Sequence, residues 1–118
     1  MTMLSCWLPE AFRAELKRRG ETMVVVASGE IDLASVDELE VHLRDALNRS
    51  SHVVLDLRRV GFIDCAGLRR MLDIQNAAGE GGGDFAVIPG PSHVQRVFLI
   101  TRTFGAFHFI DCSEIAAA

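Results

Sequence analysis

Alternating hydrophobic and polar positions near the start of the chain predict an edge strand followed by a buried strand. From Phe12 to Lys17 apolar residues take every second position, as expected when only one face of a strand is covered. Gly20-Glu21 is a turn sequence, and the apolar run 22–27 predicts a second, central strand. We therefore expect a hairpin over residues 12–27. Residues 1–10 show no period and are predicted to form a loose arm.

The central stretch, residues 53–72, predicts a strand that leads through a tight turn into a helix. The run 53–57 is short, apolar and rich in β-branched residues, which is typical of a strand buried on both faces. Residues 58–61 are predicted to break it. Asp64 is placed to cap a helix over residues 66–78, whose free backbone N–H groups favour an anion or a phosphate.

Two further helices are predicted on either side of this stretch. Ser35 and Glu38 fit a capping box, with Ser35 as the N-cap of a helix that ends near Asn48. Ser92 is predicted to cap a third helix after the turn at 89–91. Two sets of residues could form the inner face of this helix. One is Val94, Val97, Phe98 and Thr101, and the other is Leu99 and Ile100.

The remaining elements complete an alternating order of strands and helices. The glycine-rich segment 79–83 predicts a flexible loop, and strands are expected at 85–88 and 107–110. One or two helical turns are expected between 111 and 118. The order β-β-α-β-α-β-α-β predicts a single α/β domain over residues 1–118. We expect a mixed central sheet of four or five strands with three or four helices, mainly on one face.

The composition of the chain argues against several classes of function. The chain is 49% hydrophobic and 24% charged, with a formal net charge of −4, which argues against a nucleic-acid partner. No apolar run reaches the roughly 18 residues of a membrane span, and the N-terminus lacks a secretion signal. Cys6, Cys65 and Cys112 are widely spaced, which speaks against disulfides and a zinc site. We expect a cytoplasmic protein without membrane insertion, metal or cofactor.

Three stretches together resemble the STAS domain family, the fold of the anti-sigma factor antagonists. Residues 29–32 read G-E-I-D and resemble the family's G-E-[IL]-D. Residues 54–57 and 62–68 read V-L-D-L and F-I-D-C-A-G-L, and they resemble its v-l-D-l…f-[IM]-D-S-[ST]-G-[LI] segment. Residues 86–98 resemble its last strand and helix. The likeness covers about residues 11–111, and the middle stretch is its specific part.

The resemblance implies a small binding protein that takes part in a partner switch. Such a protein binds an anti-sigma factor, often a serine protein kinase of the histidine-kinase-like ATPase fold, and so regulates transcription. Phosphorylation of the Ser or Thr before the helix-opening Gly ends the binding, because a dianionic phosphate adds repulsion at the interface. Here Ala66 occupies that position and Cys65 replaces the preceding Ser. The protein would then be permanently competent to bind, or be controlled in another way, for example by oxidation of Cys65.

The resemblance also implies which residues face the partner. These are Glu30, Asp32, Asp64, Cys65, Ala66, Gly67, Leu68 and Arg69. Each has a simpler reading beside the functional one. Asp64 could act only as a helix cap, and Cys65 could be a small side chain that fills a serine-sized space. Glu30 and Asp32 could serve only to solvate a loop.

Other classes of function remain as alternatives. A cysteine at a strand-to-helix turn is a possible nucleophile, but the C-x5-R of cysteine phosphatases would need arginine where Met71 stands. We therefore do not expect an enzyme. A free-standing STAS subunit of a lipid or anion ABC transporter is one alternative, and a redox-sensing module that uses Cys65 is another. A self-associating structural module is a third, although a monomer or weak dimer is expected.

Overall fold

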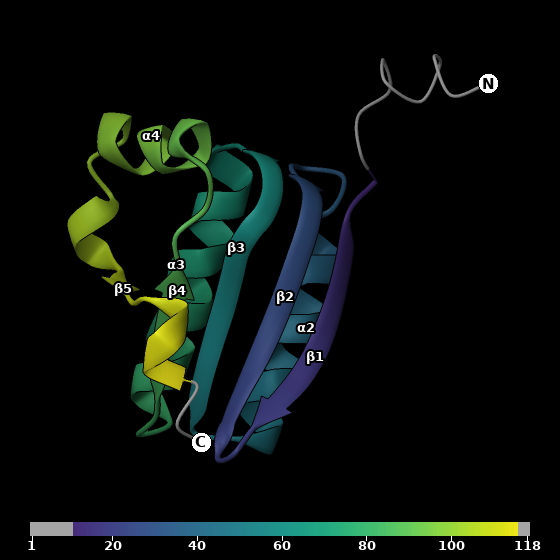
Figure 1. The fold of residues 1–118 in the computed structure, drawn as a ribbon, viewed down its shortest axis with the longest axis vertical. Coiled ribbons are helices and arrows are strands. Elements are labelled where there is room, and N and C mark those ends of the chain that lie inside the picture. The colour runs from purple at the N-terminus through teal and green to yellow at the C-terminus, as the bar shows by residue number, and fades with distance from the viewer. Residues whose placement is uncertain (1–10, 116–118) are drawn as a thin grey trace.

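The computed structural model describes residues 11–115 and contains one five-stranded sheet in the order β1-β2-β3-β4-β5 (Figure 1). The first two strands pair antiparallel and the other neighbours pair parallel. This confirms the predicted hairpin and mixed sheet. The strands are β1 Arg13–Arg19, β2 Thr22–Ile31, β3 His52–Ile63, β4 Asp84–Ile88 and β5 His108–Phe109.

Three α-helices and two short 3-10 helices connect and follow these strands in the described residues. They are α2 Val36–Arg49, α3 Cys65–Glu80, α4 Ser92–Ile100, η1 Phe104–Ala106 and η2 Cys112–Ile115. The predicted order of strands and helices is confirmed. The expected loose arm at 1–10 and the last residues of the expected terminal helix, 116–118, lie outside the described residues.

The helices α2 and α3 lie side by side on one face of the sheet, and α4 lies near the carboxyl ends of the parallel strands (Figure 1). The main hydrophobic core lies between this face and the helices. In α4, Val94 and Phe98 are buried, whereas Leu99 and Ile100 are 61% and 72% exposed. The first of the two predicted inner faces is therefore the correct one.

The opposite face of the sheet is covered only in part. A small second cluster is formed there by Val24, Val54, Ile88 and Ile110, and Cys112 and Ile115 pack against it. We call the part of this face over β1, β2 and β3 the open face. Its β1 side chains are Arg13, Glu15, Lys17 and Arg19, because the alternate residues Ala14 and Leu16 pack on the core.

The strand β3 does not end at Leu57, as predicted, but continues to Ile63. Its register against β2 shifts twice, from Val26↔Asp56 to Ser28↔Arg59 and from Gly29↔Val60 to Glu30↔Phe62. Each shift leaves one extra residue on β3, which is a β-bulge. The first bulge reverses the inward and outward alternation, and the second restores it. Ile63 consequently faces the core, and Asp64 follows at the start of α3.

Of the helix caps predicted at Ser35 and Ser92, one is confirmed in position and one is wrong. Ser35 is the N-cap of α2, as predicted, but its hydroxyl makes no cap bond to the helix, so the predicted capping box with Glu38 does not form. The Ser35 Oγ instead donates to the carbonyl oxygen of Glu30 at 2.8 Å, which fixes the preceding loop. Ser92 is the first residue inside α4, and Pro91 is the N-cap. The ring of Pro91 fixes its φ angle, and its side chain makes no cap bond to the helix.

A buried carboxylate on the open face is held by the first bulge. The Asp56 side chain is 6% exposed and accepts two hydrogen bonds to one oxygen from Arg58, from its backbone N–H at 3.0 Å and its Nε at 3.1 Å. The Arg58 guanidinium also donates to the second oxygen at 2.8 Å. Burial by itself would raise the pKa of Asp56, but these bonds and the charge of Arg58 outweigh it and lower the pKa below its ordinary value of 3.8.

We predict that Asp56→Asn lowers the free energy of unfolding by about 1–2 kcal/mol at neutral pH, because a charged hydrogen-bonded pair with one solvated partner is lost. A carboxylate with a lowered pKa stabilises the fold above its unfolded pKa, and this contribution disappears as pH falls through the folded pKa. Urea unfolding of both proteins should therefore give a difference that closes in acid below the ordinary pKa of 3.8. A difference that stays constant into strong acid would contradict this account.

Candidate functional site

The carboxyl ends of β2 and β3 bring the two predicted halves of the site together. The backbone N–H of Asp64 donates to the carbonyl oxygen of Ile31 at 3.2 Å. This bond joins the end of the G-E-I-D segment to the start of α3. In parallel α/β sheets, binding sites form at this edge because the loops that follow the strands meet there. Glu30 and Asp32 therefore lie beside the first turn of α3, as the sequence predicted.

The loop between β2 and α2 is ordered by its own polar side chains. The Asp32 carboxylate accepts from the backbone N–H of Ala34 at 3.0 Å and faces the Ser35 hydroxyl at 3.3 Å. Gly29 has a φ of 84°, a backbone conformation that residues other than glycine rarely adopt. Gly29 also lies at the second register shift of β2 against β3. The G-E-I-D segment thus has a structural role, and the half-buried Asp32 shapes the loop.

The first turn of α3 is fixed by a cap and by a close contact. The Asp64 side chain accepts from the backbone N–H of Gly67 at 3.1 Å, so the predicted N-cap is confirmed. Gly67 lies directly on the strand ends. A Cβ there would stand 2.7 Å from Cγ2 of Ile31 and 2.9 Å from Cγ1 of Ile63. Only glycine lets the helix approach the sheet this closely.

The predicted partner-facing residues fall into three groups by exposure. Cys65 and Arg69 are exposed, and Glu30, Asp32, Asp64 and Ala66 are half-buried. Gly67 and Leu68 are buried, and Leu68, only 4% exposed, packs into the main core. These two residues position the helix. A charged substitution at Leu68 would therefore test the stability of the fold rather than binding.

Two exposed apolar residues at this edge were missed by the sequence reasoning. Leu33, directly after Asp32, is 78% exposed, and Phe62, just before Ile63, is 45% exposed. Large apolar side chains in solvent often mark a contact surface. The sequence carries one signal for Leu33. This leucine lies in a turn, and neither helical nor strand periodicity assigns it to the core.

A shallow groove begins at this edge and runs along α3. It encloses about 420 Å³ between α3 and the segment that follows α4. Its lining residues are Cys65, Leu68, Arg69, Leu72, Asp73, Asn76, Thr101 and Thr103. The ring of His93 donates to the carbonyl oxygen of Gly61 at 2.7 Å, which holds α4 against the end of β3. The groove thus extends from the start of α3 to the segment that follows α4.

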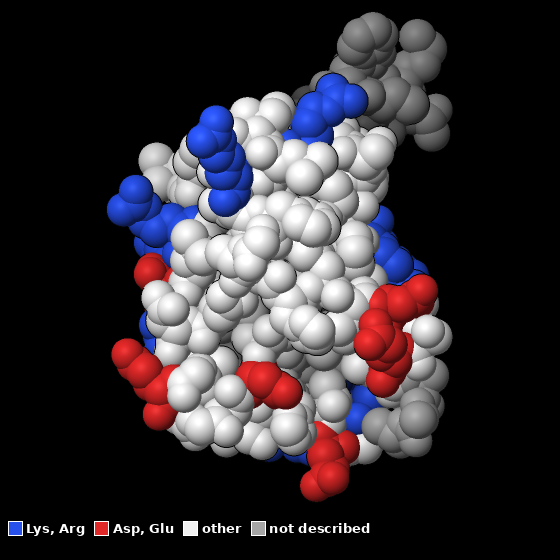
Figure 2. All heavy atoms as spheres, turned by 90° about the vertical axis from the view of Figure 1, so that its left-hand side faces the viewer, with Lys and Arg blue, Asp and Glu red and all other residues white. Residues whose placement is uncertain are grey.

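The side of the molecule that carries α4, η1 and β5 has few charged side chains over most of its area (Figure 2). Leu99 and Ile100 of α4 and Phe104 of η1 are exposed there. On α3, Arg69 and Arg70 differ in their surroundings. Arg70 donates to Asp37 and Glu40 of α2, each at 2.7 Å, and so ties the two helices together. Arg69 lines the groove and forms no ion pair within the described residues.

The described residues hold no group of three or more His, Cys, Asp or Glu side chains that could bind a metal ion. None of their helices combines the length with the apolar character that a membrane crossing requires.

A comparison with protein-family models identifies the family to which this fold belongs. Residues 14–103 match the family model described as "Mlab, STAS domain". The chain belongs to the STAS domain family. The family resemblance found in the sequence is therefore confirmed, together with the predicted mixed α/β fold.

Other STAS proteins match most of the chain. BtrV of Bordetella bronchiseptica, which its name places among the anti-sigma factor antagonists, is 29% identical over 97 residues, or 81% of this chain and 84% of BtrV. The crystal structure of an anti-sigma factor antagonist from Mycobacterium paratuberculosis has a TM-score of 0.75 at 22% identity, covering 93% of this chain and 94% of that chain. The antagonist SpoIIAA in its unphosphorylated form has a TM-score of 0.70 at 21% identity, covering 88% and 91%. At these identities the two solved structures establish the fold.

We predict that Gly67→Ala lowers the free energy of unfolding of this STAS domain by about 1–2 kcal/mol, because overpacking costs more than the gain in helix propensity. Gly79→Ala is the matched control in the same helix, since a Cβ at Gly79 would meet nothing within 4 Å. The control should raise stability by about 0.5–1 kcal/mol. Equal effects in thermal or urea unfolding would show that Gly67 is not a contact point.

Proposed function

We propose that this protein is an anti-sigma factor antagonist that binds an anti-sigma factor through the edge formed by the β2–α2 loop and the start of α3. The anti-sigma factor is proposed to be a serine kinase of the histidine-kinase-like ATPase fold. Binding of the anti-sigma factor by this protein would release a sigma factor and so regulate transcription. The observation that carries the proposal is the pair of exposed apolar residues, Leu33 and Phe62, beside the first turn of α3.

The arrangement suits binding of a protein surface. Interfaces usually centre on a few apolar anchors surrounded by polar groups. Here Leu33 and Phe62 supply the anchors, and Glu30, Asp32 and Arg69 supply charged side chains around them. The groove along α3 extends the surface toward α4 and can accept a side chain of the partner. The relative BtrV is named as an anti-sigma factor antagonist, which supports the same class of function.

Control by phosphorylation is proposed to be absent in the natural protein. SpoIIAA has been solved in unphosphorylated and phosphorylated forms, so that relative carries a phosphate in one state. In this chain, Ala66 stands in the first turn of α3, at the position assigned to the acceptor, and has no hydroxyl group. The neighbouring Cys65 is a free, exposed thiol. The interface is therefore proposed to stay competent to bind, with oxidation of Cys65 as the alternative means of control.

The first experiment is affinity capture of the tagged protein from its own cells, with the captured proteins identified by mass spectrometry. An anti-sigma factor or related kinase among them supports the proposal. A transporter ATPase would instead favour the alternative of a free-standing transporter subunit. Recovery of only the protein itself would favour the self-associating module.

We predict that Leu33→Asp weakens binding of the captured partner at least about tenfold, because a central apolar anchor is replaced by a charge. Val41→Asp is the matched control, since Val41 is also an exposed apolar residue (66% exposed) but lies on α2. Titration calorimetry with the purified partner measures both affinities. If the two variants bind equally well, the proposed edge is not the interface.

We also predict that Ala66→Ser turns the protein into a phosphoryl acceptor for its captured kinase, because it restores a hydroxyl in the first turn of α3. Incubation with the kinase and labelled ATP should label this variant and leave the natural protein unlabelled, and the phosphorylated variant should lose affinity. Labelling of the natural protein, or none in either protein, would contradict the proposed switch position.

A further inference from the structure

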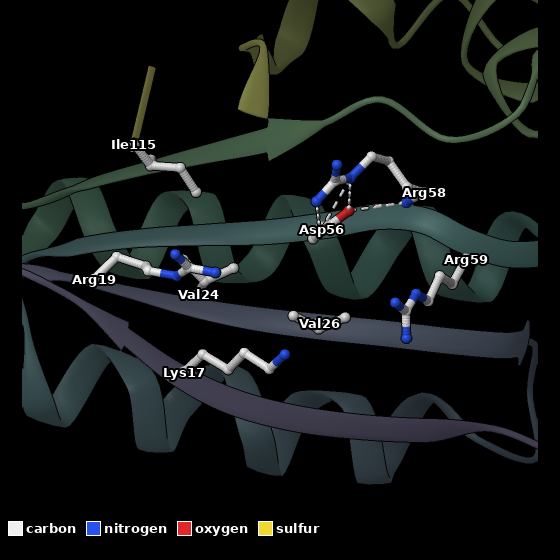
Figure 3. A pocket seen from close by; sticks show the side chains of 8 residues that line it. All are labelled: Lys17, Arg19, Val24, Val26, Asp56, Arg58, Arg59 and Ile115. Carbon is white, nitrogen blue, oxygen red and sulfur yellow. Dashed lines mark hydrogen bonds and ion pairs between the residues drawn. The ribbon is translucent and has the colours of Figure 1, made fainter. Parts of the chain in front are cut away.

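The open face of the sheet carries a second hollow, away from the proposed partner edge. It encloses about 310 Å³ above β1, β2 and β3, and its rim is rich in basic side chains (Figure 3). Lys17 and Arg19 come from β1, and Arg58 and Arg59 come from β3. This volume lies within the range of small-molecule sites. The hollow is thus large enough for a ligand of a few functional groups.

The first bulge of β3 is what brings two neighbouring arginines into this hollow. Consecutive residues of a regular strand point to opposite faces. The extra residue between Asp56 and Arg59 removes this alternation, so both Arg58 and Arg59 line the same hollow. Bulges often redirect side chains at functional sites. Arg58 pairs with the buried Asp56, whereas Arg59 points over β2 toward Val26 (Figure 3).

Three positive charges in the hollow are left without an ion pair in the part of the chain that the structure describes. Lys17, Arg19 and Arg59 form no ion pair with any of the described residues. Glu15 lies on the same face of β1 and lines an adjoining hollow together with Arg59, yet it pairs with neither Arg59 nor Lys17. The chain as a whole has a net charge of −4. The clustering of basic side chains in this hollow therefore does not follow from the overall composition.

The floor of the hollow is apolar. Val24 and Val26 form it, and Ile115 of η2 lies at its edge. Lys17 and Arg59 approach the floor from opposite sides (Figure 3). A small molecule with several negative charges would be held by the three cations, while an attached apolar group could cover the valines. A single carboxylate would neutralise only one of the three.

We propose that this hollow binds a small polyanion of the phosphate class, a diphosphate or a phosphorylated metabolite, independently of the partner edge. Phosphate groups accept several charge-assisted hydrogen bonds at once, and arginine matches their geometry. The mutual repulsion of Lys17, Arg19 and Arg59 is relieved when such an anion binds. The site depends on the β3 bulge and requires no catalytic group.

The test is titration calorimetry of the full chain with sodium pyrophosphate at low and at physiological salt. We expect saturable binding with one site per chain that weakens as salt is added. Arg59→Met and Lys17→Met should each weaken it at least about tenfold. Arg96→Met is the matched control, because Arg96 is exposed on α4 and also forms no ion pair with the described residues; its affinity should stay within about twofold.

Circular dichroism and thermal unfolding check that the variants are folded, and Arg19→Met provides an independent third substitution in the hollow. Phosphate could also be presented by a lipid headgroup, so sedimentation with phosphatidylglycerol vesicles forms a second arm. Binding to vesicles without saturable binding of pyrophosphate would overturn the proposal. So would the absence of any saturable heat, or an equal loss of affinity in the Arg96→Met control.

Discussion

The close approach of α3 to the ends of β2 and β3 is the contact on which the rest of the structure depends. Gly67 has no side chain, so the first turn of the helix rests directly on Ile31 and Ile63. The Asp64 cap and the bond from Asp64 to Ile31 hold this geometry in place. Because both strand ends are fixed to one helix start, the loop that carries Leu33 and the turn that carries Cys65 occupy a single edge.

The two faces of the sheet therefore differ in what covers them and in what they contribute. One face buries the core under α2 and α3 and supplies the stability of the domain. The other face is covered only near β4 and β5, which leaves charged side chains of β1 and β3 in solvent. The proposed partner edge lies at the carboxyl ends of the strands, where both faces terminate. Substitutions on the open face and at the partner edge can therefore be studied separately.

The sequence predicted the order of the elements well, because strong periodicity and turn residues mark them. The Asp64 cap, the hairpin and the buried positions Val94 and Phe98 follow from such local signals. The end of β3 was wrongly predicted because two consecutive arginines interrupt the alternation that identifies a strand. Only pairing with β2 shows that they lie in a bulge.

The role of the predicted site residues in binding stays a prediction, but the structure shows how they are arranged. The family resemblance implied that Glu30 and Asp32 lie beside the start of α3, and a backbone bond between Ile31 and Asp64 joins these two segments. Exposure, however, depends on tertiary packing, so the sequence could not separate the buried Leu68 from the exposed Leu33. The capping box predicted at Ser35 does not form for a similar reason, since the Ser35 hydroxyl finds a backbone partner in Glu30 that local spacing does not reveal.

The paired bulges of β3 also restrict how the length of this segment can change during evolution. Loss of one residue between Asp56 and Ile63 would remove a single bulge and turn every following side chain to the opposite face. Ile63 would then point to solvent, and the first turn of α3 would lose its contact with Ile63 at Gly67. Only the loss of two residues, one from each bulge, preserves the orientation. Among homologous chains, viable length differences in this segment should therefore be even numbers.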